Sequence, residues 1–480
     1  MKKLLVALGI LAALLALAGV AILVLVDVNA HKPRIESAVS DALGMEFRIR
    51  GKARLRLFPS AGIVLSDVRL RNRGTDLATA EALRVGVKLR PLLDRRVVIT
   101  ELALEKPVIR IEKGIDGKFN YETPPRPAKP AAKEGEVPSA PLTVSDGSVS
   151  GGKIVYVDRK AKSETSLDAI DLSVRDLSIP PATGAGLSKG ISFSGDLSAK
   201  EVKTKDFTVS DIRAKVTAEA GVYEIRPFTM RLFGGTGEGG IRLDLSGETP
   251  TMKVNYTLAK FSAGESLAAF AREKFLTGPM TVTEDLSLRG NNADEMLRTL
   301  SGAVSLRGDG LTLHGMEIDK ILSKAEEARK LSLADVGAFV LAGPLGSAAL
   351  KGYRYGDLYR SAAMEGGTRI SRLVSDWTVR DGVADARDVA FSTGENRIAL
   401  KGKLDLVNRR FVDVTVAALD RKGCARIRQK ISGPFGDPRL DKTSVLQSFA
   451  EPILGAFERA GKLLGMSSCE TFYAGTVQQP

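Results

Sequence analysis

Residues that carry catalysis or hold metals are scarce in this chain. Its 480 residues include two histidines, His31 and His314, and two cysteines, Cys424 and Cys469. Histidine is the commonest general acid–base group, and a structural zinc site needs about four Cys or His ligands close together. No C-x-x-C, H-E-x-x-H or G-x-x-x-x-G-K-[ST] motif occurs. We therefore expect no enzyme activity, no resident metal and no cofactor.

Two further patterns resemble a cofactor-binding or a catalytic motif, but the residues around them do not support such a site. Residues 235–240 read Gly-Thr-Gly-Glu-Gly-Gly, which matches the G-x-G-x-x-G fingerprint of dinucleotide sites. That fingerprint needs a helix directly after it, whereas residues 241–245 alternate like a strand, so we expect a glycine bend instead. Glu284 and Asp285 form a carboxylate pair. Neighbouring strand residues point to opposite faces, however, so the two could not share one substrate.

The N-terminus determines the compartment. Leu4 to Val26 is a run of 23 uncharged residues, which spans ~35 Å as a helix and exceeds the ~30 Å hydrocarbon core of a bilayer. The preceding Met1-Lys2-Lys3 predicts a cytoplasmic tip, with the rest of the chain across the membrane. The alternative is a signal peptide cleaved after Ala30, but signal cores have about 7–15 apolar residues. We therefore expect an uncleaved membrane anchor.

The expected export limits which partner the net positive charge can attract. The formal net charge is +13, and a basic surface can contact nucleic acid or anionic lipid. An exported domain does not meet chromosomal DNA, so we expect no nucleic-acid partner.

The two cysteines are expected to pair in an oxidising compartment. A Cys424–Cys469 disulfide closes a loop of ~45 residues and contributes about 4 kcal/mol in the chain-entropy model. The alternative is two unpaired buried thiols.

Much of the exported chain has the two-residue periodicity of strands, and its 48 glycines favour many turns. In the first stretch an apolar row alternates with a row of cations, which predicts either an ordinary solvated strand face or a face that contacts anionic lipid. The apolar row is Phe47, Ile49, Ala53, Leu55 and Leu57, and the cations are Arg48, Arg50, Lys52, Arg54 and Arg56. The alternation recurs at Leu83, Val85, Val87 and Leu89. Further strands are expected at 97–104 and 108–111.

A repeated unit of Gly, one residue and apolar-polar-apolar begins at Gly195, Gly240, Gly302 and Gly402. It suggests a long antiparallel sheet built from similar hairpins, and a sheet that curves without closing would line a trough with its apolar face. Six prolines between Thr123 and Pro141 predict a linker or exposed loop. Helices are expected at 33–43, 264–275, 293–300, 316–341 and 444–464. The last is amphipathic and would either cap a core or rest on a membrane.

These pieces together resemble the AsmA family of inner-membrane-anchored periplasmic proteins of Gram-negative bacteria. The resemblance is carried by the order of short pieces along the chain, and it is strongest over residues 1–122 and 290–420. The pieces are the anchor, Gly51 to Leu55, Phe58-Pro59, Ser66 to Asn72, Pro91 to Leu93, Pro107 to Ile111, Asp116 to Asn120, Gly302 to Gly315 with Asp319, Arg380 to Ala384 and Gly402 to Leu406.

The resemblance implies a mainly β fold, with a long curved antiparallel sheet that forms an open U-shaped groove, as in bridge-like lipid-transfer proteins. It divides the chain into five parts. These are an anchor (1–30), an N-terminal β-region (31–122), a Pro-rich linker or loop (123–141), a β-groove region with helices (142–420) and a C-terminal segment with an amphipathic helix and the disulfide (421–480).

The implied function is not enzymatic: support of outer-membrane assembly, with glycerophospholipid acyl chains carried in the groove. The expected partners are the inner membrane, phospholipid, and outer-membrane or periplasmic assembly proteins. The groove candidates are Leu55, Leu57, Leu83, Val85, Val87 and Leu89, and the headgroup or membrane candidates are Arg48, Arg50, Lys52, Arg54 and Arg56. The alternative is a scaffold that binds no lipid and regulates protein targeting to, or assembly in, the outer membrane.

Overall fold

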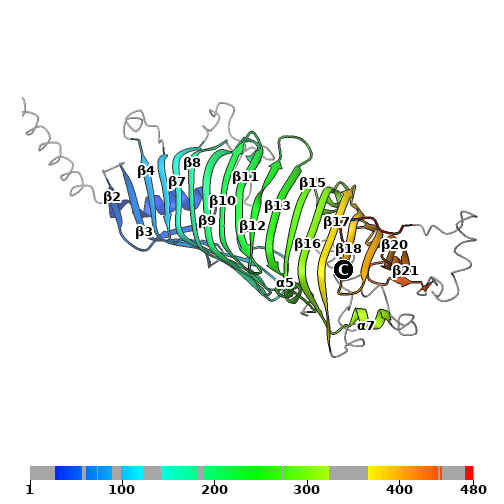
Figure 1. Ribbon diagram of the computed structural model, residues 1–480. Coiled ribbons are helices and arrows are strands. Elements are labelled where there is room, and N and C mark those ends of the chain that lie inside the picture. The colour runs from blue at the N-terminus through cyan, green and yellow to red at the C-terminus, as the bar shows by residue number, and fades with distance from the viewer. Residues whose placement is uncertain are drawn as a thin grey trace, which may run out of the picture. The chain divides into compact units, whose positions relative to one another are not determined.

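The computed structural model describes residues 28–56, 61–72, 74–88, 99–122, 142–180, 187–271, 275–323, 366–441, 444–445 and 471–478. These residues are mainly β with a few short helices, which confirms the predicted class (Figure 1). The chain forms two compact units, Met1–Pro227 and Phe228–Pro480. The boundary lies within 142–420, the range that the sequence treats as one region.

The first unit is a sheet in which long strands lie side by side (Figure 1). Their pairing order is β1 and β2, then β3, β4, β5 and β6, then β7, β8, β9 and β10. The strands are β1 (Glu46–Ile49), β2 (Ala53–Arg56), β3 (Gly62–Asn72), β4 (Thr75–Val87), β5 (Ile99–Glu105), β6 (Val108–Lys113), β7 (Leu142–Asp158), β8 (Ser163–Ile179), β9 (Ser192–Lys203) and β10 (Thr208–Glu219). The next strand, β11 (Val222–Leu232), crosses the boundary between the units.

This sheet is mixed, so the prediction of a purely antiparallel sheet is wrong. Strands β5 and β6 both pair with β7 in parallel. Parallel neighbours need a connection of a dozen or more residues, and residues 114–141 supply that length. The Pro-rich range 123–141 lies outside the described residues.

The first amphipathic stretch forms two strands and not one. Strands β1 and β2 both pair with β3, and the chain between them, residues 50–52, hydrogen-bonds irregularly to Ser66 and Asp67. Gly51 lies so close to β3 that an added Cβ would be 2.6 Å from the Ser66 carbonyl oxygen. A side chain there would not fit, so the interruption requires glycine.

Helix α2 (Lys32–Leu43) covers the start of this sheet and confirms the helix expected at 33–43. It has proline in its first turn and ends at Gly44, whose φ of 72° is the left-handed conformation that glycine adopts readily. Ile35 and Val39 of the helix pack on a buried cluster that includes Phe47 and Leu65.

The second unit contains strands that pair as β12, β13, β15, β16, β17, β18, β19, β20 and β21, all antiparallel, while β14 adds to β16 and both β22 and β23 add to β21. The strands are β12 (Gly235–Asp244), β13 (Thr251–Ser262), β14 (Leu276–Thr277), β15 (Pro279–Arg289), β16 (Ser301–His314), β17 (Gly367–Arg380), β18 (Val383–Ser392), β19 (Arg397–Asp405), β20 (Arg410–Leu419), β21 (Ala425–Pro434), β22 (Arg439–Leu440) and β23 (Ser444–Val445). The helices are α5 (Ala263–Ala271), α6 (Ala293–Arg298) and α7 (Ile318–Ser323), each within a range where a helix is expected or one residue beyond it. Helix α4 (Leu187–Gly190) belongs to the first unit.

The second unit has a packed core on one face of its sheet, and the opposite face is covered around β17–β20. The main cluster includes Trp377, Phe391 and Phe411. On the opposite face Val374, Ala390, Ala399 and Ala417 form a second cluster with side chains from the C-terminal segment, residues 471–478. Both faces of these strands are therefore buried.

Two local predictions are wrong. Residues 235–240 form part of strand β12 and not a bend, because the glycines make room for the Tyr256 ring of β13: a Cβ on Gly237 would be 2.2 Å from its hydroxyl oxygen. The helix expected at 444–464 does not begin at Ser444, because Ser444 and Val445 pair with Arg428 and Ile427 of β21. Residues 446–470 lie outside the described residues.

The predicted anchor, Leu4 to Val26, also lies outside the described residues. Within the described ranges, no helix combines the length and hydropathy that crossing a bilayer requires.

Candidate functional site

One face of the first sheet is apolar from β1 and β2 to β10. Directly opposed residues of neighbouring strands share a face, and following them across eight strand positions gives three rows without a polar side chain. The first row is Leu55, Ile63, Val85, Leu102, Gly147, Val174, Gly195 and Val216. The second is Ala53, Leu65, Leu83, Leu104, Val149, Leu172, Leu197 and Ala214. The third is Phe47, Leu70, Ala78, Ile109, Ile154, Leu167, Val202 and Val209. We call these rows the apolar face.

The opposite face is polar. The row between the first two contains mostly charged and hydroxyl side chains: Arg54, Val64, Arg84, Ala103, Ser148, Ser173, Asp196 and Lys215. Ion pairs cross this face, and Arg84 contacts Glu105 at 2.7 Å. One apolar face and one polar face are normal for a sheet in which only one face is turned away from water.

The apolar face is covered at its beginning and only half-buried farther along. The cluster under α2 includes Leu55, Leu83 and Leu104, and among the described residues it contains none from β7–β10. On those strands Val149, Leu172 and Leu197 are half-buried. Apolar side chains left partly open along four adjacent strands form a surface suited to an apolar ligand.

Several of the predicted groove residues lie on one face of the sheet, and their contact with lipid stays a prediction. Leu55, Leu83 and Val85 belong to the apolar face, and Val87 on the same strand is half-buried. Leu57 and Leu89 lie outside the described residues. The half of the apolar face that lies on β7–β10 was missed, although alternation such as Ile170-Asp171-Leu172 could have indicated it.

The five predicted cations divide into two groups. Arg48 pairs with Glu36 and Glu46, and Arg56 pairs with Glu101, so these two stabilise the fold. Arg50, Lys52 and Arg54 are exposed. Within the described part of the chain, no carboxylate pairs with these three cations.

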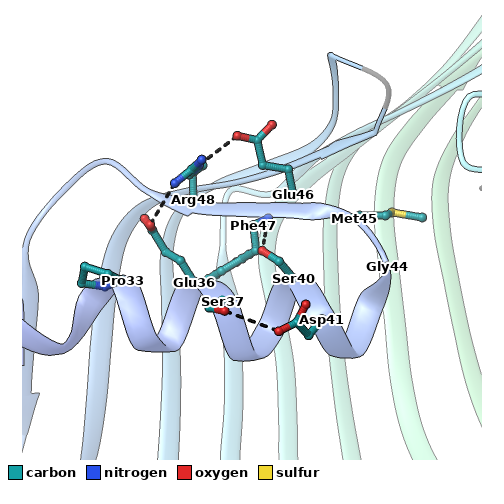
Figure 2. A pocket seen from close by; sticks show the side chains of 10 residues that line it. All are labelled: Pro33, Glu36, Ser37, Ser40, Asp41, Gly44, Met45, Glu46, Phe47 and Arg48. Carbon is teal, nitrogen blue, oxygen red and sulfur yellow. Dashed lines mark hydrogen bonds and ion pairs between the residues drawn. The ribbon is translucent and has the colours of Figure 1, made fainter. Parts of the chain in front are cut away.

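A cavity of about 440 Å³ lies between α2 and β1, where Pro33, Glu36 and Arg48 are among the lining residues (Figure 2). Its polar groups bind one another: the Ile49 amide donates to Glu36 at 2.7 Å, and the Phe47 amide donates to the Ser40 hydroxyl at 2.9 Å. The hydrogen bond from Arg48 lowers the pKa of Glu46. These contacts hold the helix on the sheet, so we interpret the cavity as structural.

The C-terminal segment (residues 471–478) binds across the second sheet. Tyr473 donates a hydrogen bond from its hydroxyl to Asp388, and Arg397 donates to the Val477 carbonyl oxygen at 3.1 Å. The guanidinium of Arg397 also lies 5.4 Å from the Tyr473 ring centre. Thr471 forms a bridge with Cys424, which is buried and disulfide-bonded. Cys469 lies outside the described residues, so the Cys424–Cys469 pairing remains a prediction.

The described residues contain no group of three or more His, Cys, Asp or Glu side chains arranged to hold a metal ion. His314 hydrogen-bonds to Thr277 at 2.8 Å across β14 and β16. Glu284 faces the core side of the second sheet, opposite Tyr256, while Asp285 is exposed on the other face, as the sequence predicts.

Comparison with known proteins agrees with the resemblance. A model of the AsmA family matches residues 1–207 and 187–388. The chain is 22% identical over 219 residues to protein AsmA of Escherichia coli (strain K12), and the match covers 45% of this chain and 31% of that protein. The chain thus spans less than a third of the length of this curated relative. No solved structure matches the chain. Because the family model covers more than half of the sequence, the chain belongs to the AsmA family.

Proposed function

We propose that the apolar face carries acyl chains of glycerophospholipids on their way from the inner membrane to the outer membrane. The observation that supports this most is the composition of the three rows, in which eight successive strand positions contribute only apolar side chains or glycine. Each acyl CH₂ moved from water onto such a surface contributes about 0.8 kcal/mol. A chain of ordinary length is therefore held without specific polar contacts.

The absence of polar side chains within the rows also favours movement along them. Neighbouring strands are ~4.8 Å apart, so a row of eight positions measures about 34 Å. Because each position offers a similar apolar contact, the binding free energy of a lipid chain is similar at every strand. No single strand would therefore hold the lipid in place. The apolar face would then act as a track and not as a closed binding pocket.

The exposed cations fit the membrane end of this track. Arg50, Lys52 and Arg54 follow the anchor and α2 closely in sequence, and each cation near an anionic leaflet contributes about 1 kcal/mol of attraction. We propose that they contact anionic headgroups of the inner membrane, to which Leu4 to Val26 anchors the chain. In this role the protein is not an enzyme, and the bulk of the chain works in the periplasm.

A second candidate is a scaffold that regulates protein targeting to, or assembly in, the outer membrane without binding lipid. The buried faces of β17–β20 favour it, because a sheet covered on both sides leaves no surface for an acyl chain there. Under this proposal the apolar face of the first unit would be covered by a protein partner.

A charge placed on the apolar face distinguishes the two candidates. Val85→Glu introduces a carboxylate at the third position of the first row, whereas Val64→Glu places the same group on the polar face between Arg54 and Arg84. If lipid binds, both variants fold, and Val85→Glu alone loses co-purifying phospholipid, measured by mass spectrometry. A folded Val85→Glu variant with undiminished lipid would exclude the track. Wild-type protein that carries no lipid would favour the scaffold.

A further inference from the structure

One end of the strands in the first unit carries three neighbouring turns. They are residues 114–122 after β6, 159–162 between β7 and β8, and 204–207 between β9 and β10. The Arg159 amide donates to the Lys113 carbonyl oxygen at 3.0 Å, which joins the first two turns. In the register of β8 and β9 Ser166 pairs with Lys203, so the third turn lies at the same end. We call these three turns the turn surface.

The turn surface exposes apolar side chains to water. Among the described residues five large apolar side chains are exposed, and two of them, Ile115 at 78% and Tyr121 at 43%, belong to it. A third, Leu43 at 52%, ends α2 and comes shortly before Glu46, which pairs with Arg71 at the same strand end. Single exposed apolar residues are normal, but three at one end of a sheet indicate an interaction surface.

Hydrogen bonds fix the turn that carries Ile115. The Gly114 amide donates to the Lys118 carbonyl oxygen at 2.8 Å, and the Lys118 amide donates to the Asp116 carboxylate at 3.1 Å. The side chain of Asn120 binds the backbone of β6 as both donor and acceptor, at 2.7 and 2.9 Å. The exposed position of Ile115 is therefore a built feature of the fold.

The turn surface is also basic, with five Lys or Arg side chains against three Asp or Glu. Arg159 forms an ion pair with Glu112 at 2.8 Å. The other four cations are exposed and have no ion-pair partner within the described part of the chain: Lys118, Lys160, Lys162 and Lys205. Lysines without a partner around exposed apolar side chains suit a surface that is anionic outside and apolar beneath.

A bilayer that contains anionic lipid has this chemistry. An isoleucine can enter the boundary between headgroups and acyl chains, a tyrosine lies at headgroup level, and lysines reach the phosphates. An acidic protein would pair with the lysines but would not need Ile115 at the outermost position. We propose that the turn surface contacts the inner-membrane bilayer to which the chain is anchored.

That bilayer is within reach of the turn surface. The predicted anchor ends at Val26, and the Ala53 amide donates to the Asn29 side chain at 2.9 Å. Ala53 pairs with Leu65, and the strand end at Asn72 is seven residues, or ~23 Å, farther along β3. Three strand spacings of ~4.8 Å separate β2 from β6. The contact would orient the sheet on the membrane, which a single helical anchor does not. It is independent of lipid transport, because a scaffold would be oriented in the same way.

The test measures how close the turn surface lies to the bilayer. Full-length protein is inserted by its anchor into nanodiscs of phosphatidylcholine, with or without phosphatidylglycerol. An environment-sensitive fluorophore is attached at Ala161→Cys, an exposed site between two of the lysines. Spin-labelled lipid in the disc should quench it, more strongly in anionic discs and less in high salt. The same fluorophore at Glu219→Cys, exposed at the opposite strand end, should stay unquenched, and unmodified protein gives the background labelling.

Removing the apolar side chain at the tip should weaken the contact. Ile115→Ser in the labelled protein is expected to lower the ratio of contacting to free turn surface about tenfold, because the isoleucine no longer leaves water. Val108→Ser is the matched control, since Val108 is also exposed, at 40%, but lies within β6. Both side chains are exposed, so neither change should lower the melting temperature by much.

Removing two of the lysines tests the charge. The Lys160→Gln, Lys162→Gln double variant should lower the same ratio about 25-fold in anionic discs, at about fivefold for each lysine. In discs of phosphatidylcholine alone it should have little effect. The Arg213→Gln, Lys215→Gln double variant removes two exposed cations from the middle of β10 and should retain the quenching.

Equal quenching at positions 161 and 219 would overturn the inference, and so would full quenching in Ile115→Ser. Quenching only by spin-labelled vesicles added outside the disc would exclude the anchored membrane as the partner. The co-purifying phospholipid of the same variants is a separate measurement. If it is unchanged while the quenching is lost, the lipid track stands apart from the membrane contact.

Discussion

Tyr473 donates its hydroxyl hydrogen to Asp388, a residue 85 positions earlier in the chain. The same carboxylate accepts hydrogen bonds from the amide and the hydroxyl of Thr476, at 2.9 and 2.6 Å. Asp388 thus holds the C-terminal segment (residues 471–478) on the second sheet. The contact covers alanine and valine side chains that would otherwise face water.

Replacing Asp388 should therefore detach this segment. Burial alone would raise the pKa of Asp388, but the hydrogen bonds from Thr476 and Tyr473 outweigh it and keep the pKa below its ordinary value. Hydrogen bonds to a charged group contribute about 1.5–3 kcal/mol, so Asp388→Asn should destabilise the unit by a similar amount at pH 7. Because the folded-state pKa is lowered, this contribution is lost as pH falls through it, and the variant should approach wild type in acid. Denaturant unfolding at several pH values measures both effects, and Asp381→Asn in an exposed turn serves as the control.

The predicted Cys424–Cys469 disulfide should reinforce the same attachment, since Thr471 pairs with Cys424. Peptide mapping without reductant is expected to find the two cysteine peptides linked. The Cys424→Ser, Cys469→Ser double variant should lower the melting temperature and expose residues 471–478 to hydrogen exchange. Two thiols that alkylate freely in native protein would contradict the pairing.

Gly147 offers a way to block the apolar face without straining the sheet. A Cβ built there would meet its nearest atom, the Cβ of Val174, at 3.5 Å, an ordinary contact distance. Gly147→Leu should therefore fold at least as well as wild type, because glycine within a strand is unfavourable. Its side chain would fill the first row, and bound phospholipid should decrease. Ser148→Leu adds the same side chain on the polar face, and equal lipid in the two variants would argue against the track.

Glu284 should make stability fall as pH rises. Its folded-state pKa is raised from 4.5, so between 4.5 and the raised pKa the folded state binds more protons than the unfolded state. Stability is therefore lost across that window and does not return at higher pH. Tyr256 faces Glu284 from β13 and remains protonated throughout. Glu284→Gln should be more stable than wild type at neutral pH, and the difference should vanish near pH 4 in thermal unfolding. A constant difference at all pH values would show that the carboxyl group does not titrate as expected.

The predicted anchor is tested most directly on protein extracted from membranes. Intact mass should correspond to a chain that retains Leu4 to Val26. A chain that begins at His31 would mean that the segment is a cleaved signal peptide.

Alternation along the chain determined which residues share a face. Leu55 and Val85 could be assigned to an apolar face and Arg54 to a polar one, because successive strand residues point in opposite directions whatever the partner strand is. Composition likewise excluded a metal centre built on cysteines, and the order of short motifs indicated the family. The helix at 33–43 followed from its proline and glycine boundaries. Each of these predictions depends either on a short stretch of sequence or on a count of residues along the chain.

The tertiary structure determines which strands and side chains each of these residues contacts. The pairing of β7 with β5 and β6 in parallel depends on which strands find one another after a long connection, and no local pattern encodes it. The same holds for Arg56, which is neutralised by Glu101 from a strand 45 residues away, and for Glu284, whose neighbours on β13 and β16 carry no cation. Periodicity is a property of one strand. Register, by contrast, is chosen by the burial that all strands achieve together, and only register aligns 22 apolar side chains and two glycines into three rows.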